Sequence, residues 1–222
     1  MAQFLISVIF NSSNPMAKRS ANSKGYSDRK LNTREVEETF LIVCEGTKTE
    51  PSYFRSFRVP REVIDIPREV IDIEVEGLGE NPTRLVERAI TRAKEEQFDQ
   101  VWCVFDRDSF PVSDITKAVA LAKKNKIQIA YSNEAFELWY ILHFQFLNAA
   151  IPRSDYSKKL SSLMEKPYAK NSRDMYDDLL SRQPIAIANA DRLLQEYPTP
   201  NPVTDNPSTT IHQLVKQLNR FI

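Results

Sequence analysis

Three carboxylates follow directly on two apolar segments of the chain. Asp106 and Asp108 come after Val101–Phe105, and Glu45 comes after Phe40–Cys44. Apolar runs of this length are typical of strands that are buried on both faces of a parallel sheet. Ligands of such sheets bind beyond the carboxyl ends of the strands, where these three side chains would meet.

Three carboxylates at one place repel one another unless a cation lies between them. Oxygen ligands without a neighbouring thiolate or imidazole suit Mg²⁺ or Mn²⁺. The pattern therefore predicts an acidic metal site used for metal-dependent phosphodiester chemistry. Gly46 would let the backbone approach a metal or phosphate without a Cβ clash. Arg107 would point away from the cleft or bind a phosphate, and Lys48 and Lys170 are further candidate phosphate ligands.

Other chemistries fit these residues less well. Gly46–Thr49 resembles a P-loop, but its Gly and Lys are not adjacent and the upstream Gly is missing. The Asp-x-Asp of an aspartate-nucleophile phosphatase would follow the first strand rather than the third, and a glycosyltransferase Asp-x-Asp requires no Glu-Gly after the first strand. For Asp108, simple capping of the next helix stays open.

The residues from Thr39 to Tyr131 predict alternating strands and helices that would bring the carboxylates together. Four strands are expected, at Phe40–Cys44, in the stretch 67–76, at Val101–Phe105 and at Ile127–Tyr131. Helices are expected between them, with N-caps at Thr49, Asn81 and Ser113. This order predicts a doubly wound parallel sheet with right-handed crossovers. In a flavodoxin-like strand order, strands one and three flank the switch point where ligands bind.

After Ser132 the pattern is mostly helical, with expected helices at 134–146, 154–165, 172–197 (broken near Pro184) and 208–221. No independent second core is visible, so residues 147–222 are expected to pack on an α/β core at 36–146. Glu134 and Glu137 would share a helical face, and Glu137 is the better candidate to close the site. That both are only the solvated edge of a packed helix stays open.

Two segments stand apart from this pattern. Residues 1–35 are predicted to be a disordered basic arm, and Met16 looks like a natural start, so residues 1–15 are expected to come from an upstream start codon. Pro60–Ile66 is repeated at once as Pro67–Ile73. Because one copy suffices for a strand, the first copy is expected to bulge out as a loop or extend the sheet edge.

The composition bounds the class of protein. The chain has 222 residues, of which 41% are hydrophobic and 27% charged, as in ordinary globular proteins. Thirty basic residues balance thirty acidic ones, so net charge neither indicates nor excludes nucleic acid. Cys44 and Cys103 lie in expected buried strands and are predicted to be free thiols. No apolar run is long enough to span a membrane and no signal peptide is recognisable, so a cytoplasmic protein without a membrane partner is expected.

The motifs, taken in order, resemble a known family. Glu45-Gly46 after the first strand and Asp106-Arg-Asp108 after the third look like the Toprim signature of topoisomerases, primases and OLD-family nucleases. With Asn133–Trp139, His143-Phe144 and Asn206–Thr210 added, the sequence from Ser27 to the C-terminus is similar to RloB-like proteins.

This resemblance implies a Toprim-like α/β fold and a Mg²⁺- or Mn²⁺-dependent nuclease that cleaves RNA or DNA. It also implies a partner, an ABC-type or AAA-like ATPase encoded nearby, and a role in bacterial anti-phage defence by abortive infection. Glu45 would be the general base or a metal ligand, Asp106 and Asp108 metal ligands, and Glu50 a ligand of a second metal or a helix cap. His143 and His212 are expected to pack or hydrogen-bond. The alternative is a non-catalytic interaction subunit that docks the ATPase.

Overall fold

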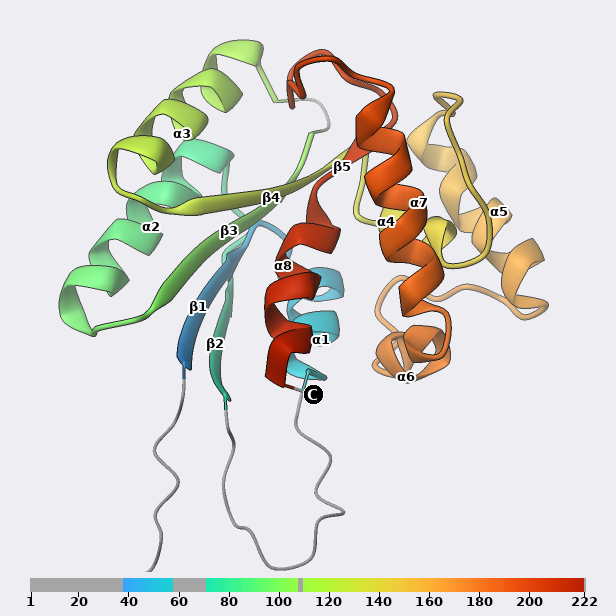
Figure 1. The fold of residues 1–222 in the computed structure, drawn as a ribbon, viewed down its shortest axis with the longest axis horizontal. Coiled ribbons are helices and arrows are strands. Elements are labelled where there is room, and N and C mark those ends of the chain that lie inside the picture. Colours follow the sequence, from blue (N-terminus) through green and yellow to red (C-terminus); the bar gives the residue numbers. More distant parts are fainter. Residues whose placement is uncertain (1–37, 58–70, 108–109, 222) are drawn as a thin grey trace, which may run out of the picture. The chain divides into compact units, whose positions relative to one another are not determined.

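Two apolar strands lie at the centre of the sheet (Figure 1). β1 (Glu38–Cys44) and β3 (Gln100–Asp106) pair in parallel, and the last five residues of each are buried. β2 (Ile71–Gly77) pairs in parallel with β1, and β4 (Gln128–Asn133) in parallel with β3. The predicted doubly wound parallel sheet, with strands one and three adjacent, is confirmed. A short fifth strand that was not predicted, β5 (Ser208–Thr209), adds to β4 in the antiparallel direction and completes the order β2-β1-β3-β4-β5.

The computed structural model describes residues 38–57, 71–107 and 110–221. These residues belong to one compact unit. The predicted arm at 1–35, the first heptapeptide copy and Asp108 lie outside the described residues. The second heptapeptide copy ends in β2, as its alternating pattern indicates.

Helices cover both faces of the sheet (Figure 1). One face carries α2 (Pro82–Glu95) and α3 (Val112–Lys124), whose apolar residues pack on Leu41, Val43, Cys103 and Phe105. The other face carries the remaining helices, whose apolar residues join those of β1 and β3 in a second cluster. They are α1 (Thr49–Arg55), α4 (Glu137–Leu142), α5 (Arg153–Met164), α6 (Met175–Leu180), α7 (Gln183–Gln195) and α8 (Ile211–Leu218), which a 3₁₀ turn at Asn219–Phe221 extends.

The C-terminal helices share their apolar cluster with the sheet. Leu160, Leu193 and Leu214 belong to the same cluster as Phe40 and Ile42. Among the described residues, the C-terminal helices and the sheet therefore contribute to one apolar cluster. The boundary predicted after residue 146 falls between α4 and α5, inside this cluster.

The helix starts were predicted with mixed success. Asn81 caps α2, because its Oδ1 accepts a hydrogen bond from the Arg84 amide at 3.0 Å. Thr49 is not a cap: it is the first residue of α1, and its buried hydroxyl donates to the Lys170 carbonyl. Ser113 is not a cap either, because α3 begins at Val112 after Pro111. In both wrong cases the helix begins earlier than the polar side chain suggests.

Both cysteines are free and buried, as predicted. No helix in the described part of the chain is long and apolar enough to cross a membrane.

Candidate functional site

The register of the two central strands brings Glu45 beside Asp106. Cys44 pairs with Val104, and the Glu45 amide continues the ladder by donating to the Val104 carbonyl at 2.8 Å. The Glu45 side chain then turns towards β3, where its Oε2 accepts a hydrogen bond from the Asp106 amide at 3.0 Å. The two residues thus meet at the carboxyl ends of adjacent parallel strands.

Asp106 is held where a negative charge is disfavoured. Only 5% of the residue is exposed, and burial raises the pKa of its carboxyl well above the ordinary range. The nearby carboxylates of Glu50 and Glu45 act in the same direction, and Arg153 opposes them. The Arg153 guanidinium, from the start of α5, lies 3.2 Å from Asp106 Oδ2. Asp106 therefore has a cationic partner that does not offset its burial.

Glu50 adds a second buried carboxyl from the first turn of α1. Burial raises its pKa, and its own backbone amide, followed by Lys170, opposes that effect. Its carboxylate lies against Gly46, where an added Cβ would come within 2.2 Å of Glu50 Oε2. Gly46 was predicted to admit a metal or phosphate, but here its missing side chain makes room for Glu50. Any larger residue at position 46 would displace this carboxylate.

Glu137 approaches the same carboxylates from α4. It is buried, its Oε1 accepts a hydrogen bond from the Tyr168 hydroxyl at 3.2 Å, and Lys170 Nζ lies 3.6 Å from the same oxygen. The negative charge of Glu137 contributes to the raised pKa values of Asp106 and Glu50. The prediction that Glu134 and Glu137 share a helical face is wrong, because α4 begins only at Glu137.

Sequence reasoning missed Arg153 and did not indicate the partner of Lys170. Arg153 lies 47 residues from its partner Asp106 in the sequence, and nothing in its local pattern indicates that pairing. Lys170 was taken as a candidate phosphate ligand, whereas in the fold it lies beside Glu137. Only the packing of α5 and the following segment against α1 and α4 brings these cations to the carboxylates.

The other predicted phosphate ligands lie at the rim. Lys48 precedes α1 and is exposed. Arg107 follows β3, where its amide donates to the Ser132 carbonyl at 2.8 Å, and its Nη1 lies 3.4 Å from the Phe110 carbonyl. Asp108, the third predicted metal ligand, is outside the described residues.

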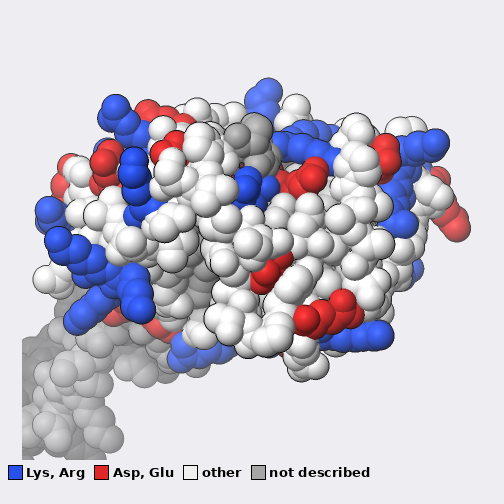
Figure 2. Space-filling view, turned by 90° about the horizontal axis from the view of Figure 1, so that it is seen from above, with Lys and Arg blue, Asp and Glu red and all other residues white. Residues whose placement is uncertain are grey.

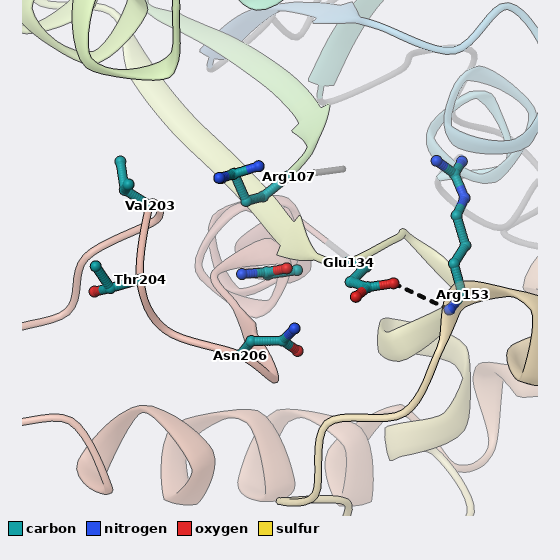
Figure 3. A pocket seen from close by; sticks show the side chains of 7 residues that line it. Arg107, Glu134, Arg153, Val203, Thr204 and Asn206 are labelled. Carbon is teal, nitrogen blue, oxygen red and sulfur yellow. Dashed lines mark hydrogen bonds between the residues drawn. The ribbon is translucent and has the colours of Figure 1, made fainter. Parts of the chain in front are cut away.

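A pocket of about 540 Å³ opens beside these carboxylates (Figure 3). Arg107 comes to it from the end of β3, Glu134 from the turn after β4, and Arg153 from the start of α5. The Arg153 amide donates to Glu134 Oε2 at 3.0 Å. The remaining lining residues are Asn133, Val203, Thr204 and Asn206, so the segment before β5 forms one wall. We call this cavity the Arg107 pocket.

The two histidines pack within the helical face. His143 is fully buried and its Nδ1 lies 2.9 Å from the Trp139 carbonyl; burial lowers its pKa to about 4. His212 Nε2 lies 3.1 Å from Asp191 Oδ1, and burial outweighs this partner, so that its pKa is also lowered to about 4. Both side chains are therefore neutral at pH 7 and act as packed, hydrogen-bonded groups.

The chemistry of the donors fits a hard divalent cation. Glu45, Glu50, Asp106 and Glu137 supply only oxygen, and buried carboxylates that raise one another's pKa would be stabilised by a positive charge. No group of three acidic, histidine or cysteine side chains among the described residues is close enough to hold a metal ion. The cation paired with Asp106 is the Arg153 guanidinium.

The surface at this end of the sheet carries both signs of charge. Figure 2 shows basic and acidic side chains interspersed over this face, without a broad patch of either sign. In this view the described surface offers no extended basic track, and the arginines of the Arg107 pocket are local groups that suit an anion.

The fold and the site define an α/β protein with a doubly wound sheet and buried carboxylates at the carboxyl ends of its central strands. A family model described as RloB-like protein matches residues 40–218, and the chain therefore belongs to the RloB-like family. No curated protein and no solved structure matches the chain.

Proposed function

We propose that this RloB-like protein is a Toprim-type nuclease that hydrolyses phosphodiester bonds in RNA or DNA with Mg²⁺ or Mn²⁺. The observation that carries the proposal is the meeting of Glu45 and Asp106, with the Glu45 carboxylate 3.0 Å from the Asp106 amide. It is supported by the burial of Asp106 among further carboxylates, an environment in which a divalent cation offsets an existing electrostatic penalty.

The metal would be held by Glu45, Asp106 and Asp108, with Glu50 or Glu137 beside them. When bound, it polarises the scissile phosphate and lowers the pKa of a water ligand. Arg153, which lies 3.2 Å from Asp106 Oδ2, would supply positive charge beside the substrate phosphate. Glu50, whose pKa is raised by burial, is a candidate to accept the proton of an attacking water.

The proposed setting is bacterial anti-phage defence, with an ATPase encoded nearby as the partner that controls the nuclease. This part follows from the resemblance to the RloB-like family and to Toprim nucleases. The other candidate is a non-catalytic subunit that uses the same fold to dock the ATPase. The pairing of Asp106 with Arg153 favours that candidate, because a guanidinium already lies beside the carboxylate where a metal would bind.

The decisive experiment compares the full chain with its Asp106→Asn variant, each with and without the neighbouring ATPase. Single-stranded and duplex RNA and DNA are incubated with Mg²⁺, with Mn²⁺ or with EDTA. Cleavage that needs the metal and disappears in Asp106→Asn supports the nuclease. If folded, ATPase-bound Glu45→Gln and Asp106→Asn variants protect cells from phage as well as the wild type does, the chain is an interaction subunit instead.

A further inference from the structure

The Arg107 pocket has the dimensions of a site for one small ligand. Its volume of about 540 Å³ lies in the range of small-molecule and cofactor sites. It is distinct from the carboxylates but touches them through Arg153, which lines the pocket and also contacts Asp106 Oδ2 at 3.2 Å. A ligand in the pocket would therefore lie against a residue that also contacts the candidate active site.

The charged side chains that line the pocket favour an anion near Arg107 and Arg153. Arg107 and Arg153 each bring a guanidinium group. Glu134 brings one carboxylate, whose Oε2 accepts a hydrogen bond from the Arg153 amide. The lining itself thus has two cationic side chains and one anionic side chain, and Arg153 also contacts Asp106 outside the lining. Guanidinium groups bind phosphate with paired hydrogen bonds, so the chemical class that these residues select is a phosphate ester.

The opposite wall is already formed and is polar. Asp205 fixes it: its carbonyl accepts a hydrogen bond from Asn133 Nδ2 at 2.7 Å, and its Oδ2 accepts one from the Asn201 amide at 2.6 Å. Val203 adds apolar surface to this wall. An apolar surface beside amide groups suits a nucleobase, which has apolar faces and a polar edge.

The side chain of Asn206 indicates that the ligand carries a hydrogen-bond donor. Its Oδ1 is buried, and no donor within the described residues reaches it. A buried amide oxygen without a partner is destabilising, and because Asn206 lines the pocket, a rotation of its side chain towards a ligand N–H would remove that penalty. The amino and imino groups on the edge of a nucleobase are such donors.

We propose that the Arg107 pocket binds one unpaired nucleotide of a single-stranded nucleic acid. Its phosphate lies towards Arg107 and Arg153, and its base lies against the wall formed by Val203 and Asn206. This inference rests on the proposed function and deepens it, because it assigns the substrate class. A base in a duplex is stacked and paired and enters such a pocket only after extrusion, so single strands are preferred over duplexes.

The test is a binding measurement without metal, so that cleavage plays no part. Fluorescent ten-nucleotide single strands of RNA and of DNA, and the corresponding duplexes, are titrated with the full chain in EDTA and followed by anisotropy. Thr204→Trp fills the pocket from an exposed position, and Thr116→Trp, at an exposed position of α3 on the other face of the sheet, is its matched control. Arg107→Gln is paired with Arg84→Gln, an exposed arginine of α2.

Thr204→Trp is expected to weaken binding of single strands at least about 10-fold, the effect of losing one base contact, while Thr116→Trp stays within about 2-fold of the wild type. Arg107→Gln is expected to reduce the slope of log Kd against log salt by about 1, with Arg84→Gln unchanged. The RNA and DNA arms show which strand the pocket takes.

Three results would overturn the pocket proposal. One is equal binding of single strands by the wild type and Thr204→Trp; another is tighter binding of duplexes than of single strands. The third is stronger competition by free nucleoside monophosphates than by oligonucleotides, which would make the pocket a site for a free nucleotide. If Thr204→Trp weakens binding but Asp106→Asn still cleaves, the pocket proposal is supported and the proposal of a metal-dependent nuclease is contradicted. If Asp106→Asn abolishes cleavage and Thr204→Trp changes nothing, only the pocket fails.

Discussion

Carboxylates at two places on this sheet have opposite surroundings. At the β2 edge, Glu74 and Glu76 face arginines of α2: Arg92 contacts both, and Arg88 contacts Glu76 at 2.8 Å. The hydrogen bond from Arg88 lowers the pKa of Glu76. At the carboxyl ends of β1 and β3, burial instead raises the pKa of Asp106, although Arg153 lies beside it.

The difference distinguishes carboxylates whose ion pairs stabilise the folded state from carboxylates whose burial destabilises it. Exposed ion pairs such as that of Glu76 and Arg88 contribute modestly to stability. A buried carboxyl with further carboxylates around it destabilises the folded state, and such groups occur preferentially at functional sites. The comparison is consistent with the proposed chemical role of Asp106 and with a structural role for Glu76, and each prediction below tests one of these two roles.

The largest expected effect is on cleavage. Glu45→Gln or Asp106→Asn is expected to reduce metal-dependent cleavage at least about 100-fold, because each removes a metal ligand or general base. Glu76→Gln is the matched control and is expected to stay within about 2-fold of the wild type, a bound set by its place outside the site. Single-turnover rates on the preferred strand measure both. Similar losses in Glu76→Gln and Asp106→Asn would contradict the division between the two places.

Metal binding should stabilise the wild type. Millimolar Mg²⁺ or Mn²⁺ is expected to add about 1–3 kcal/mol to the free energy of unfolding, at tens to hundreds of Kd. Asp106→Asn is expected to lose most of this gain. Asp108→Asn is expected to reduce it without lowering metal-free stability, because it relieves repulsion between like charges. Urea denaturation with metal and with EDTA measures the gain, and a wild type indifferent to both metals would argue against the site.

Removing the charge at Asp106 should stabilise the metal-free protein. At pH 7, Asp106→Asn is expected to raise the free energy of unfolding by about 0.5–2 kcal/mol, as substitutions at strained functional sites do. Because the folded-state pKa of Asp106 is raised, the wild type is penalised above that pKa and recovers as pH falls towards the unfolded value of about 3.9. The advantage of the variant should therefore shrink from pH 8 to pH 5.

One result would contradict the predicted stabilisation by Asp106→Asn. Denaturation curves in EDTA that place Asp106→Asn below the wild type at pH 7 would mean that the ion pair with Arg153 outweighs burial. Asp106 would then resemble the edge carboxylates, and the comparison would lose its basis.

The smallest expected effect is a change in the free energy of unfolding at Glu76, opposite in sign to that expected for Asp106→Asn. Glu76→Gln is expected to lower stability at pH 7 by about 0.5 kcal/mol, the usual contribution of a surface ion pair. Because the pKa of Glu76 is lowered, its contribution is present above the unfolded value of about 4.3 and is lost as pH falls through the folded pKa. Chemical denaturation at pH 7 and pH 3 measures this loss, with the exposed Glu80→Gln as control. An unchanged difference at pH 3 would show that lost packing, not charge, is responsible.

The sequence alone determined the framework of the fold and the two central members of the site. The apolar runs before Glu45 and Asp106 are local signals, and alternation of strands with helices limits the sheet to few topologies. Together they predict that the two strands are adjacent and that their terminal carboxylates meet. The cap at Asn81 is likewise local, because a side chain and an amide three residues later suffice to form it.

Only the tertiary structure decided what surrounds those carboxylates. The contact of Arg153 with Asp106, the lysine beside Glu137, and the placing of Glu50 over Gly46 depend on how α1, α4 and α5 pack against the sheet. Thr49 has the residue type of a cap, but its hydroxyl instead meets a carbonyl 121 residues away. The pocket wall before β5 likewise forms only when that segment reaches β4. Contacts between distant segments leave no periodic trace in the sequence, because each side chain is compatible with many neighbours until the chain has folded.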